Sequence, residues 1–569
     1  MTWAKNLLFL GLLVFGALTL RASLFPLTAV RDPAPVKASP EASDDFRAAV
    51  AQLDVAMRLT WQEQGLEPAP PAPELTVVRR LSLALTGTIP SLEEIRQLER
   101  LPPNERVPWW IDHLLHDRRY ADYFAERLAR TVVGTEDGPF IIYRRRRLIS
   151  WLSDQLLANR PYGETVHDLV AGKGLWTDNP GTNFITVTFE NERKEPNHER
   201  LGGRVARAFL GFRLDCAECH DHPFEHWKQT DFHGLAAFFG QTHQGFTGIY
   251  DGAGEHMMED KTTGKKTIQI APAVPFRQDL LPKDGPRREQ LARWITDVRP
   301  AQVEVYHTNA FALAAGALAT RVCQDHDNLA YNQHFARATV QRTWALLFGR
   351  PMLDNIESLF TVENSPRALL MLERDFAQHR YDLGRLIRVI AASEAFQLDS
   401  RADHEITDDH ERSFAIFPLS RLRPEQVVGS VQQAATLRTI NQDSHLLVRA
   451  ARATGEKEFV QRYGDTGEDE FAGRGGTIPQ RLLLMNGNLV KEKTKDELLN
   501  AANQIASMAP NDAAAVETAY LVVLTRRPSA EEAKHFIKRL DNVKGKERAW
   551  RLEDLYWTLI NSTEFSWNH

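Results

Sequence analysis

Cysteine is scarce in this sequence, and so is any excess of positive charge. The 569 residues include only Cys216, Cys219 and Cys323, so a framework of disulfides cannot hold the chain together. A zinc ribbon built from two C-x-x-C pairs is excluded for the same reason. The 69 Lys and Arg stand against 75 Asp and Glu, and a net charge of −6 gives no basic footprint for nucleic acid. We therefore expect no nucleic-acid partner.

Familiar hydrolase and nucleotide-binding signatures are also lacking. No Ser-His-Asp order, phosphate-binding loop or H-E-x-x-H motif occurs, so no reaction is indicated and the question of enzymatic activity stays open. The composition, 43% hydrophobic and 25% charged, is ordinary for a globular protein. The length predicts two or three domains rather than one core.

The one marked apolar run lies at the N-terminus, over residues 7–20, between Lys5 and Arg21. It is short for a membrane span but fits the hydrophobic region of an export signal. No good small-x-small cleavage site follows, so an uncleaved signal anchor over residues 1–24 is favoured over a removed peptide; a buried core helix is the other interpretation. The preceding lysine predicts that the bulk of the chain lies outside. We predict a periplasmic, extracytoplasmic location, with the chain anchored in the inner membrane or released after cleavage.

The most informative stretch is C-x-x-C-H, formed by Cys216, Cys219 and His220. This spacing is typical of c-type haem attachment. Two thiols three residues apart can form thioethers to the two vinyl groups of one porphyrin, and the adjacent histidine can then bind the iron axially. The leading hypothesis is one covalently attached haem c.

Two alternatives remain open at the same residues. The cysteines can form half of a zinc site, with His220, His222, His226 or His233 as further ligands. They can also be a plain dithiol or disulfide pair, although such motifs usually follow a strand in a βαβ unit, which residues 200–214 do not resemble.

Histidines cluster around the motif. This clustering favours a metal or redox site. Seven of the nineteen histidines fall between residues 198 and 256, namely His198, His220, His222, His226, His233, His243 and His256. The second axial ligand of a haem would set its chemistry, and the candidates are His243, His256, Met257 and Met258. The nearby Trp227, Phe232, Phe238 and Phe239 are either core residues or the wall of a porphyrin site.

Helical periodicity dominates the chain, so the predicted fold is mainly α, with two helical domains and a small loop and strand insertion. Residues 25–74 read as a tether with one helix, capped by Ser43, and a Pro-rich linker. Residues 75–245 form the domain with the cysteines, 246–286 a linker, and 287–569 a second helical domain. Within these, Ser91 and Glu94 predict a capping box, Gly349 a helix end, 231–239 a helix, and 184–189 and 267–270 short strands.

Several stretches together resemble a paired family of exported proteins best known from planctomycete-type bacteria. The matching stretches are 79–90 (RRLSLALTGTIP), 208–211 (AFLG), 216–224 (CAECHDHPF), 335–338 (FARA), 344–350 (WALLFGR), 479–480 (PQ), 484–487 (LMNG) and 559–565 (LINSTEF). The family joins a cytochrome-c-like domain of unknown function, of the PSCyt type, to a companion domain of unknown function, of the PSD type. The resemblance implies an exported protein with haem c and assigns no substrate. Residues 297–328, which include Cys323, are an insertion relative to the usual spacing of this family, so the resemblance assigns them no role.

Three functions follow as hypotheses. The first is electron transfer at the outer face of a membrane, with an unknown redox partner protein and the N-terminal helix as the membrane contact. The second is a non-haem zinc protein that uses the Cys and His cluster. The third is a helical interaction scaffold in which the motif only fastens a loop.

Overall fold

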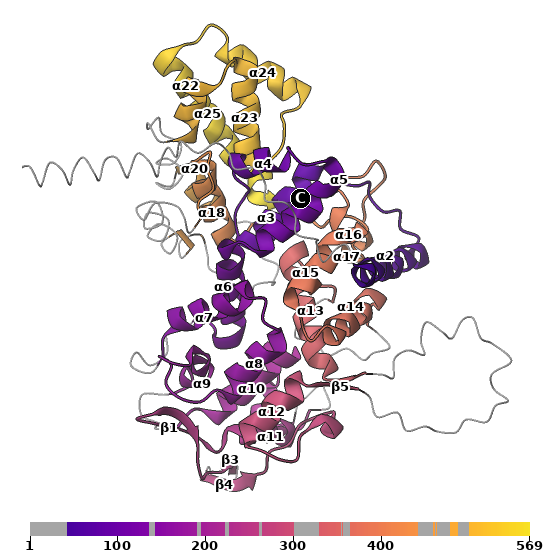
Figure 1. The fold of residues 1–569 in the computed structure, drawn as a ribbon, viewed down its shortest axis with the longest axis vertical. Helices are drawn as coiled ribbons and strands as arrows, with labels where there is room; N and C mark the ends of the chain where they lie inside the picture. Colours follow the sequence, from indigo (N-terminus) through magenta and orange to yellow (C-terminus); the bar gives the residue numbers. More distant parts are fainter. Residues whose placement is uncertain are drawn as a thin grey trace, which may run out of the picture.

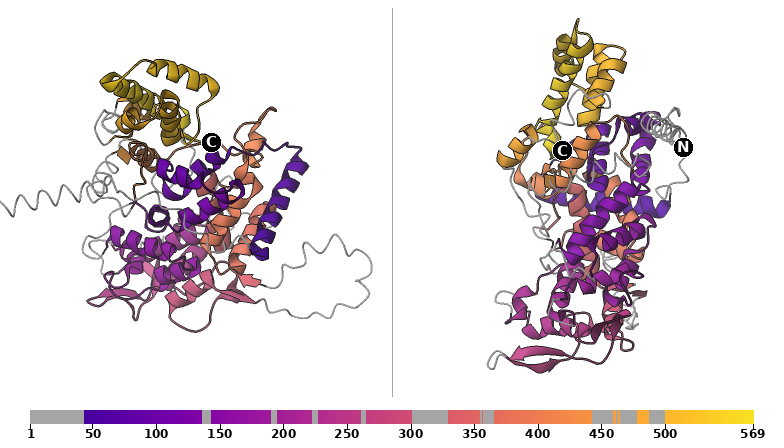
Figure 2. Two further views of the ribbon diagram at one scale, coloured as in Figure 1. Left: turned by 45° about the horizontal axis from the view of Figure 1, so that its top comes forward. Right: turned by 90° about the vertical axis from the view of Figure 1, so that its left-hand side faces the viewer.

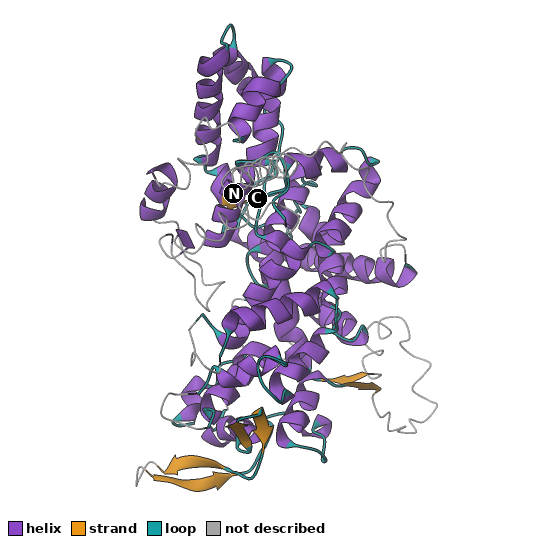
Figure 3. Cartoon of the chain, turned by 60° about the vertical axis from the view of Figure 1, so that its left-hand side comes forward, coloured by secondary structure: helices purple, strands orange, loops and turns teal. Residues whose placement is uncertain are grey.

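In the computed structural model, helices form most of the described chain, and the strands are few and short (Figures 1 and 3). The structure describes residues 43–135, 143–189, 195–221, 227–260, 265–300, 329–353, 356, 365–441, 459–460, 463, 478–486 and 500–569. The predicted signal anchor, Cys323, His222 and His226 lie outside these residues. The mainly α prediction is confirmed.

The elements follow the chain in three groups. The first contains α2 (Asp44–Gln64), α3 (Glu74–Thr86), α4 (Leu92–Leu98), α5 (Pro103–Leu115), α6 (Arg118–Val133), α7 (Arg145–Leu157), α8 (Tyr162–Ala171), η2 (Pro180–Thr182) and α9 (Asn183–Thr186). The second contains α10 (His198–Val205), η3 (Ala206–Leu210), η4 (Asp215–Glu218), α11 (Gln229–Ala236), η5 (Ala237–Phe239), β1 (Thr242–Gly245), β2 (Gly248–Asp251), β3 (His256–Asp260), β4 (Lys265–Ile270), η6 (Gln278–Leu280), α12 (Arg287–Thr296) and β5 (Val298–Pro300).

The third group contains β6 (Leu329–Tyr331), α13 (Gln333–Phe348), α14 (Arg367–Gln378), α15 (Leu383–Ala392), α16 (Glu394–Gln397), α17 (Asp408–Arg412), β7 (Ser420–Arg421), α18 (Pro424–Ala434), α20 (Ile478–Asn486), α22 (Ala501–Met508), α23 (Asp512–Leu524), α24 (Ala530–Leu540), α25 (Gly545–Ile560), η9 (Glu564–Ser566) and β8 (Trp567–Asn568). The strands pair only as antiparallel two-stranded units within the described residues: β1 with β2, β3 with β4, β5 with β6, and β7 with β8.

The molecule is elongated. Helices α22 to α25 form one end, and the hairpins β1–β2 and β3–β4 form the other, next to α10 and α11 (Figures 1 and 2). The strand insertion of the sequence prediction therefore sits at one tip of the molecule. The elements that carry the cysteine motif lie close to that tip.

Local capping signals place the helix ends correctly. Ser43 accepts a hydrogen bond from the backbone of Phe46 at the start of α2, and Ser91 and Glu94 form a reciprocal capping box on α4. Gly349 ends α13 in the left-handed conformation, at φ 82°. These predictions are confirmed, as are the helix over 231–239 and the strand at 267–270.

The strand predicted at 184–189 is wrong. The chain forms the one-turn helix α9 there, and Phe184 and Ile185 are completely buried. Phe184 packs against Phe209, with ring centroids 5.7 Å apart. Burial in a helical layer decides the conformation here, because β-branched residues prefer strands only weakly when no partner strand is present.

Helix α3 joins two hydrophobic cores. The larger core collects buried side chains from Phe46 to Phe417, including Leu81 and Leu85 of α3. The smaller core packs Leu83 of the same helix against residues between 422 and 565. Every residue of α3 from Val77 to Thr86 is buried, so this helix is an internal strut rather than a surface helix.

Candidate haem-attachment turn and neighbouring histidines

The cysteine motif follows an irregular end of helix α10. After Val205 the helix widens into the π-helical turn η3, and Gly211 then reverses the chain at φ 71°. π-Helical turns inside α-helices are frequently found at functional sites. The local structure before the motif is therefore set by an unusual backbone, not by an ordinary helix end.

This approach is fastened to helix α13, far along the chain. The guanidinium of Arg342 donates hydrogen bonds to the carbonyls of Arg207 and Ala208 in η3. A Cβ at Gly211 would stand 3.0 Å from the Cβ of Ala338 and 3.2 Å from the Ile356 carbonyl. Only glycine suits both this contact and the positive φ, so α13 fixes where the motif begins.

The motif itself is a single tight turn with its reactive groups outside. Ala217 of η4 is completely buried, whereas Cys216, Cys219 and His220 are exposed. Both thiols are free. The spacing of three residues in a 3₁₀ turn brings the two cysteines to the same side of the chain. The sequence prediction of these three site residues thus corresponds to one accessible surface turn.

The imidazole of His220 is oriented by its own chain. Its Nδ1 lies 2.7 Å from the carbonyl oxygen of Asp221. A carbonyl only accepts, so Nδ1 carries a proton and Nε2 is the ring nitrogen that a metal would bind. A metal-binding histidine commonly donates its other N–H to a carbonyl in this way. The donor set of two accessible thiols and one oriented imidazole therefore fits a haem c.

The aromatic residues around the motif are core residues. Phe212 and Trp227 stack with centroids 5.0 Å apart and an interplanar angle of 4°, and both are buried. Phe232, Phe238 and Phe239 are buried as well. These rings are therefore part of the core of the described structure.

The turn is also tied to α11. The carboxylate of Asp221 accepts a hydrogen bond from the backbone of Gln229 at 2.8 Å, at the start of that helix. The carbonyl of Glu218 accepts a hydrogen bond from the side-chain amide of Gln229 at 3.1 Å and contacts His233 Nε2 at 3.2 Å. Glu218 stands between the two cysteines, so these bonds hold the motif against α11.

Histidines from three elements meet behind the turn. His233 of α11 and His256 of β3 are buried, and His233 Nδ1 lies 2.9 Å from His256 Nε2. His256 Nδ1 is 3.4 Å from Nδ1 of His198, the first residue of α10. The side chain of Glu199 joins His233 and His256, with one ligand atom of each within 4.8 Å of the others. The structure thus brings together His233 and His256, which were both predicted as possible ligands, and Glu199, which was not.

The other predicted ligands within the described residues lie in the two hairpins. His243 contacts the Ala253 carbonyl through Nε2 at 2.9 Å and the Glu195 carboxylate through Nδ1 at 3.6 Å. Met257 and Met258 pair across the hairpin with Gln269 and Ile268. Successive side chains of a strand point to opposite faces, so Met257 lies on the face away from His256.

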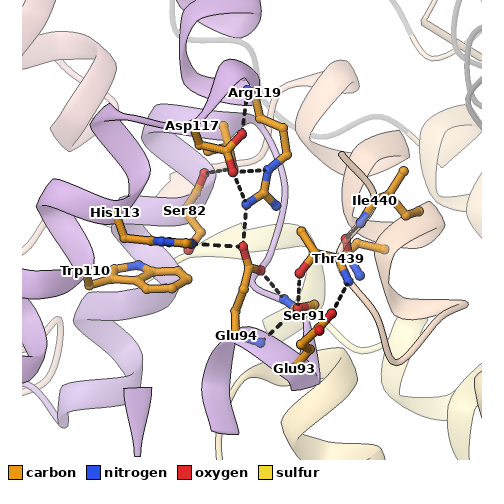
Figure 4. Close-up of polar contacts among 12 residues, drawn as sticks. Ser82, Ser91, Glu93, Glu94, Trp110, His113, Asp117, Arg119, Thr439 and Ile440 are labelled. Carbon is orange, nitrogen blue, oxygen red and sulfur yellow. Dashed lines mark hydrogen bonds and ion pairs between the residues drawn. The ribbon is translucent and has the colours of Figure 1, made fainter. Parts of the chain in front are cut away.

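A second carboxylate and histidine cluster, Glu94, His113 and Asp117, lies far from the motif in sequence. Figure 4 shows the guanidinium of Arg119 between Asp117 and Glu94, where it binds both. Burial by itself would raise the pKa of Glu94, but Arg119 and His113 lower it well below its usual range. Arginine supplies the positive charge, so this cluster is a structural ion-pair network, continued through Ser91 to Thr439.

Two family models match the chain, in the predicted order. Residues 52–244 match PSCyt2, described as a protein of unknown function (DUF1549). Residues 324–464 match PSD1, described as a protein of unknown function (DUF1553). The chain is a PSCyt2–PSD1 protein. No curated protein and no solved structure matches it.

The PSCyt2 match contains α10, η4 and the whole cysteine motif. Helix α13 belongs to the PSD1 match. The hydrogen bonds from Arg342 to η3 therefore connect the PSCyt2 segment directly to the PSD1 segment. Among the described residues, none of the helices combines the length and apolar character that crossing a bilayer requires.

Sequence reasoning missed Glu199 and the pairing of His233 with His256. The clustering of histidines in sequence was the only available signal. This clustering indicated the correct stretch of the chain. However, 57 residues lie between His198 and His256, so the spacing in sequence could not show which histidines contact each other.

Proposed function

We propose that this PSCyt2–PSD1 protein is exported and carries one haem c, joined to Cys216 and Cys219 and bound axially by His220, and that it transfers electrons. The observation that carries the proposal is the turn itself. Two free, exposed thiols and an exposed imidazole share the five residues 216–220. The N-terminal apolar run supports export, because thioether attachment of haem takes place on the outer side in bacteria.

Each residue of the turn has a separate part. Cys216 and Cys219 would hold the porphyrin through thioethers, and Ala217, buried between them, fixes the turn to the protein. The Asp221 carbonyl holds the His220 ring with Nε2 outward. When bound, the haem supplies a one-electron couple whose potential depends on its axial ligands and on exposure to solvent.

The PSD1 segment supports the site from behind. Arg342 and Ala338 of α13 hold η3 and Gly211, so the turn is braced by a helix that belongs to the second family. An electron carrier benefits from a rigid attachment, because a fixed haem changes its surroundings little between oxidation states. This gives a physical reason for the two segments to occur in one chain.

The test is expression of the full chain with a haem-maturation system, followed by absorbance, metal content and intact mass on one sample. We expect the sharp visible bands of a reduced c-type cytochrome, one iron per chain, and a mass increase equal to one haem after denaturation. The Cys216→Ala/Cys219→Ala variant should lose the covalent haem. Cys323→Ala is the matched control and should keep it.

Three results would overturn the proposal. One is wild-type protein without a Soret band; another is stoichiometric zinc with no iron, which would select the zinc alternative at the same thiols. The third is a double cysteine variant that retains covalent haem. The scaffold hypothesis would be favoured if the wild type carried no cofactor and the Cys216→Ala/Cys219→Ala variant folded and bound a partner protein as well as the wild type does.

A further inference from the structure

We propose that Glu199, His233 and His256 form a second site, which binds a first-row divalent metal ion next to the cysteine turn. The site uses none of the residues assigned to haem attachment. Two imidazole nitrogens and one carboxylate suit ions of intermediate softness, and three protein ligands leave coordination positions open for water or a small oxygen ligand. One ligand atom from each residue lies within 4.8 Å of the others.

The two imidazoles are spaced as metal ligands are. His233 Nδ1 and His256 Nε2 stand 2.9 Å apart. Because metal–imidazole bonds are about 2.1 Å long, two nitrogens bound at right angles to one ion stand about 3.0 Å apart. The rings also overlap, with centroids 5.2 Å apart and an interplanar angle of 25°. In the structure the two nitrogens share a hydrogen bond, and an ion bound by both would take the place of its proton.

The remaining ring nitrogens are held by outer partners. His233 Nε2 faces the Glu218 carbonyl at 3.2 Å, so Nε2 carries the proton and the neutral ring has its lone pair on Nδ1, toward His256. His256 Nδ1 faces His198 Nδ1 at 3.4 Å. Outer contacts of this kind orient the rings of metal-binding histidines. The Glu218 carbonyl lies within the cysteine turn, so the two sites are one hydrogen bond apart.

Two glycines permit the close approach of the three elements. A Cβ at Gly202 of α10 would lie 3.0 Å from the backbone nitrogen of Ala236 in α11. A Cβ at Gly240, after η5, would lie 2.7 Å from the backbone nitrogen of His256. Any side chain would separate α10 from α11, or η5 from β3. The absence of side chains here is what brings Glu199 and His256 to His233.

The experiment is a titration of the full-length exported protein with Co²⁺, after dialysis against a chelator, followed by visible absorption and calorimetry. We expect one equivalent of Co²⁺, with d–d bands and no thiolate-to-cobalt charge-transfer band. Glu199→Gln and His256→Gln should each weaken binding by on the order of 100-fold, since even the loss of an outer partner can cost that much. His243→Gln, a histidine of the neighbouring hairpin, is the matched control and should bind as wild type does.

Glu199 is only half-buried, so its substitution should leave the fold intact, which circular dichroism verifies. Wild type that takes up no stoichiometric Co²⁺ overturns the proposal, and so does a folded Glu199→Gln protein with unchanged affinity. In either case the cluster is a hydrogen-bonded histidine group only. Cys216→Ala/Cys219→Ala should still bind Co²⁺; loss of binding there would assign the ion to the thiols, and this result is distinct from a missing haem spectrum.

Discussion

Arg79 and Arg80 lie side by side in α3 and are almost fully buried. The Arg80 guanidinium donates to the carbonyls of Phe396, Leu398 and His569, at 3.1, 2.7 and 2.7 Å, and lies 3.7 Å from the centre of the Phe417 ring. Burial lowers the pKa of Arg80, and Asp399 partly opposes that effect. Charged donors with several carbonyl partners make strong hydrogen bonds that are costly to leave unmade.

Arg80→Lys should therefore destabilise the protein. Lysine keeps the charge but lacks the planar set of donors, so at least one buried carbonyl loses its partner. We expect the free energy of unfolding to fall by about 2–4 kcal/mol, measured by urea denaturation. Arg58→Lys, at an exposed ion pair with Glu394, is the control and should change stability by under about 0.5 kcal/mol. Equal effects of the two changes would contradict this account.

His167 gives a pH dependence at the contact between α8 and α12. Its Nδ1 lies 3.5 Å from Asp168 and its Nε2 3.0 Å from Glu289. The hydrogen bond with Asp168 raises the pKa of His167 to about 8, burial opposes this, and Glu289 adds to it. Because the folded pKa is above the unfolded value of 6.5, this stabilisation is complete below pH 6.5 and is lost as the pH rises through about 8.

His167→Gln should consequently be less stable than wild type at pH 6 and equal to it at pH 9. The site is partly exposed, so after solvent screening the difference at pH 6 should stay under about 1 kcal/mol. Denaturant midpoints of both proteins at the two pH values measure it. His535→Gln, at an exposed position of α24, is the matched control for the substitution itself. A His167→Gln deficit that is the same at both pH values would show that the charge is not responsible.

Between elements, the decisive feature is the packing of α10, α11 and β3 without intervening side chains. Gly240→Ala places a methyl group 2.7 Å from the His256 nitrogen and 3.0 Å from the Glu255 carbonyl carbon, so backbone must move. We expect a loss of about 1–3 kcal/mol in stability and weaker Co²⁺ binding, because β3 carries His256.

Gly245→Ala is the matched control for that change. Its added methyl meets only the ring of Tyr250, at 3.0 Å, and that ring is exposed and can turn away. Thermal unfolding and cobalt titration of the two variants separate packing at η5 from a general effect of alanine. If both variants behave alike, the close approach of η5 and β3 does not position His256.

Capping signals and the helix at 231–239 were predictable because they depend on neighbours within a few residues. The helix α9 was not, because a run of β-branched and aromatic residues has no fixed conformation until its surroundings are known. The same limit applies to the site. Cys216, Cys219 and His220 are set by covalent spacing, whereas Glu199 and His256 meet His233 only through contacts between elements.

At the scale of the whole molecule, the PSCyt2 and PSD1 segments share their interiors. Glu425 of α18 binds Arg127 at 3.0 Å and Arg130 at 2.9 Å, both in α6, and all three are buried. Arg79 reaches the carbonyls of Val523 and Phe565, which lie beyond the PSD1 match, so the C-terminal helices join the same interior. Removal of one partner from a buried pair leaves a charge without compensation, which is strongly destabilising.

We therefore predict that a fragment of residues 43–300 does not fold alone. It would expose the apolar partners of α3 and lack Glu425 and the carbonyls that bind Arg79 and Arg80. Weak near-UV circular dichroism and binding of a hydrophobic dye are expected, in contrast to the full chain. Coexpression with residues 329–569 is the control and should restore the near-UV signal. Cooperative unfolding of the isolated fragment would contradict the prediction.

The sequence by itself determined the helical character, the helix caps, the C-x-x-C-H motif and the order of the two families. These features depend on residues close together along the chain, or on composition. The tertiary structure alone decided that α3 serves two cores, that α13 braces the motif, and that Glu199, His233 and His256 converge. Those outcomes depend on which surfaces of the helices and strands pack together. Because the partners are far apart along the chain, the sequence pattern around each residue does not show which residues it will contact.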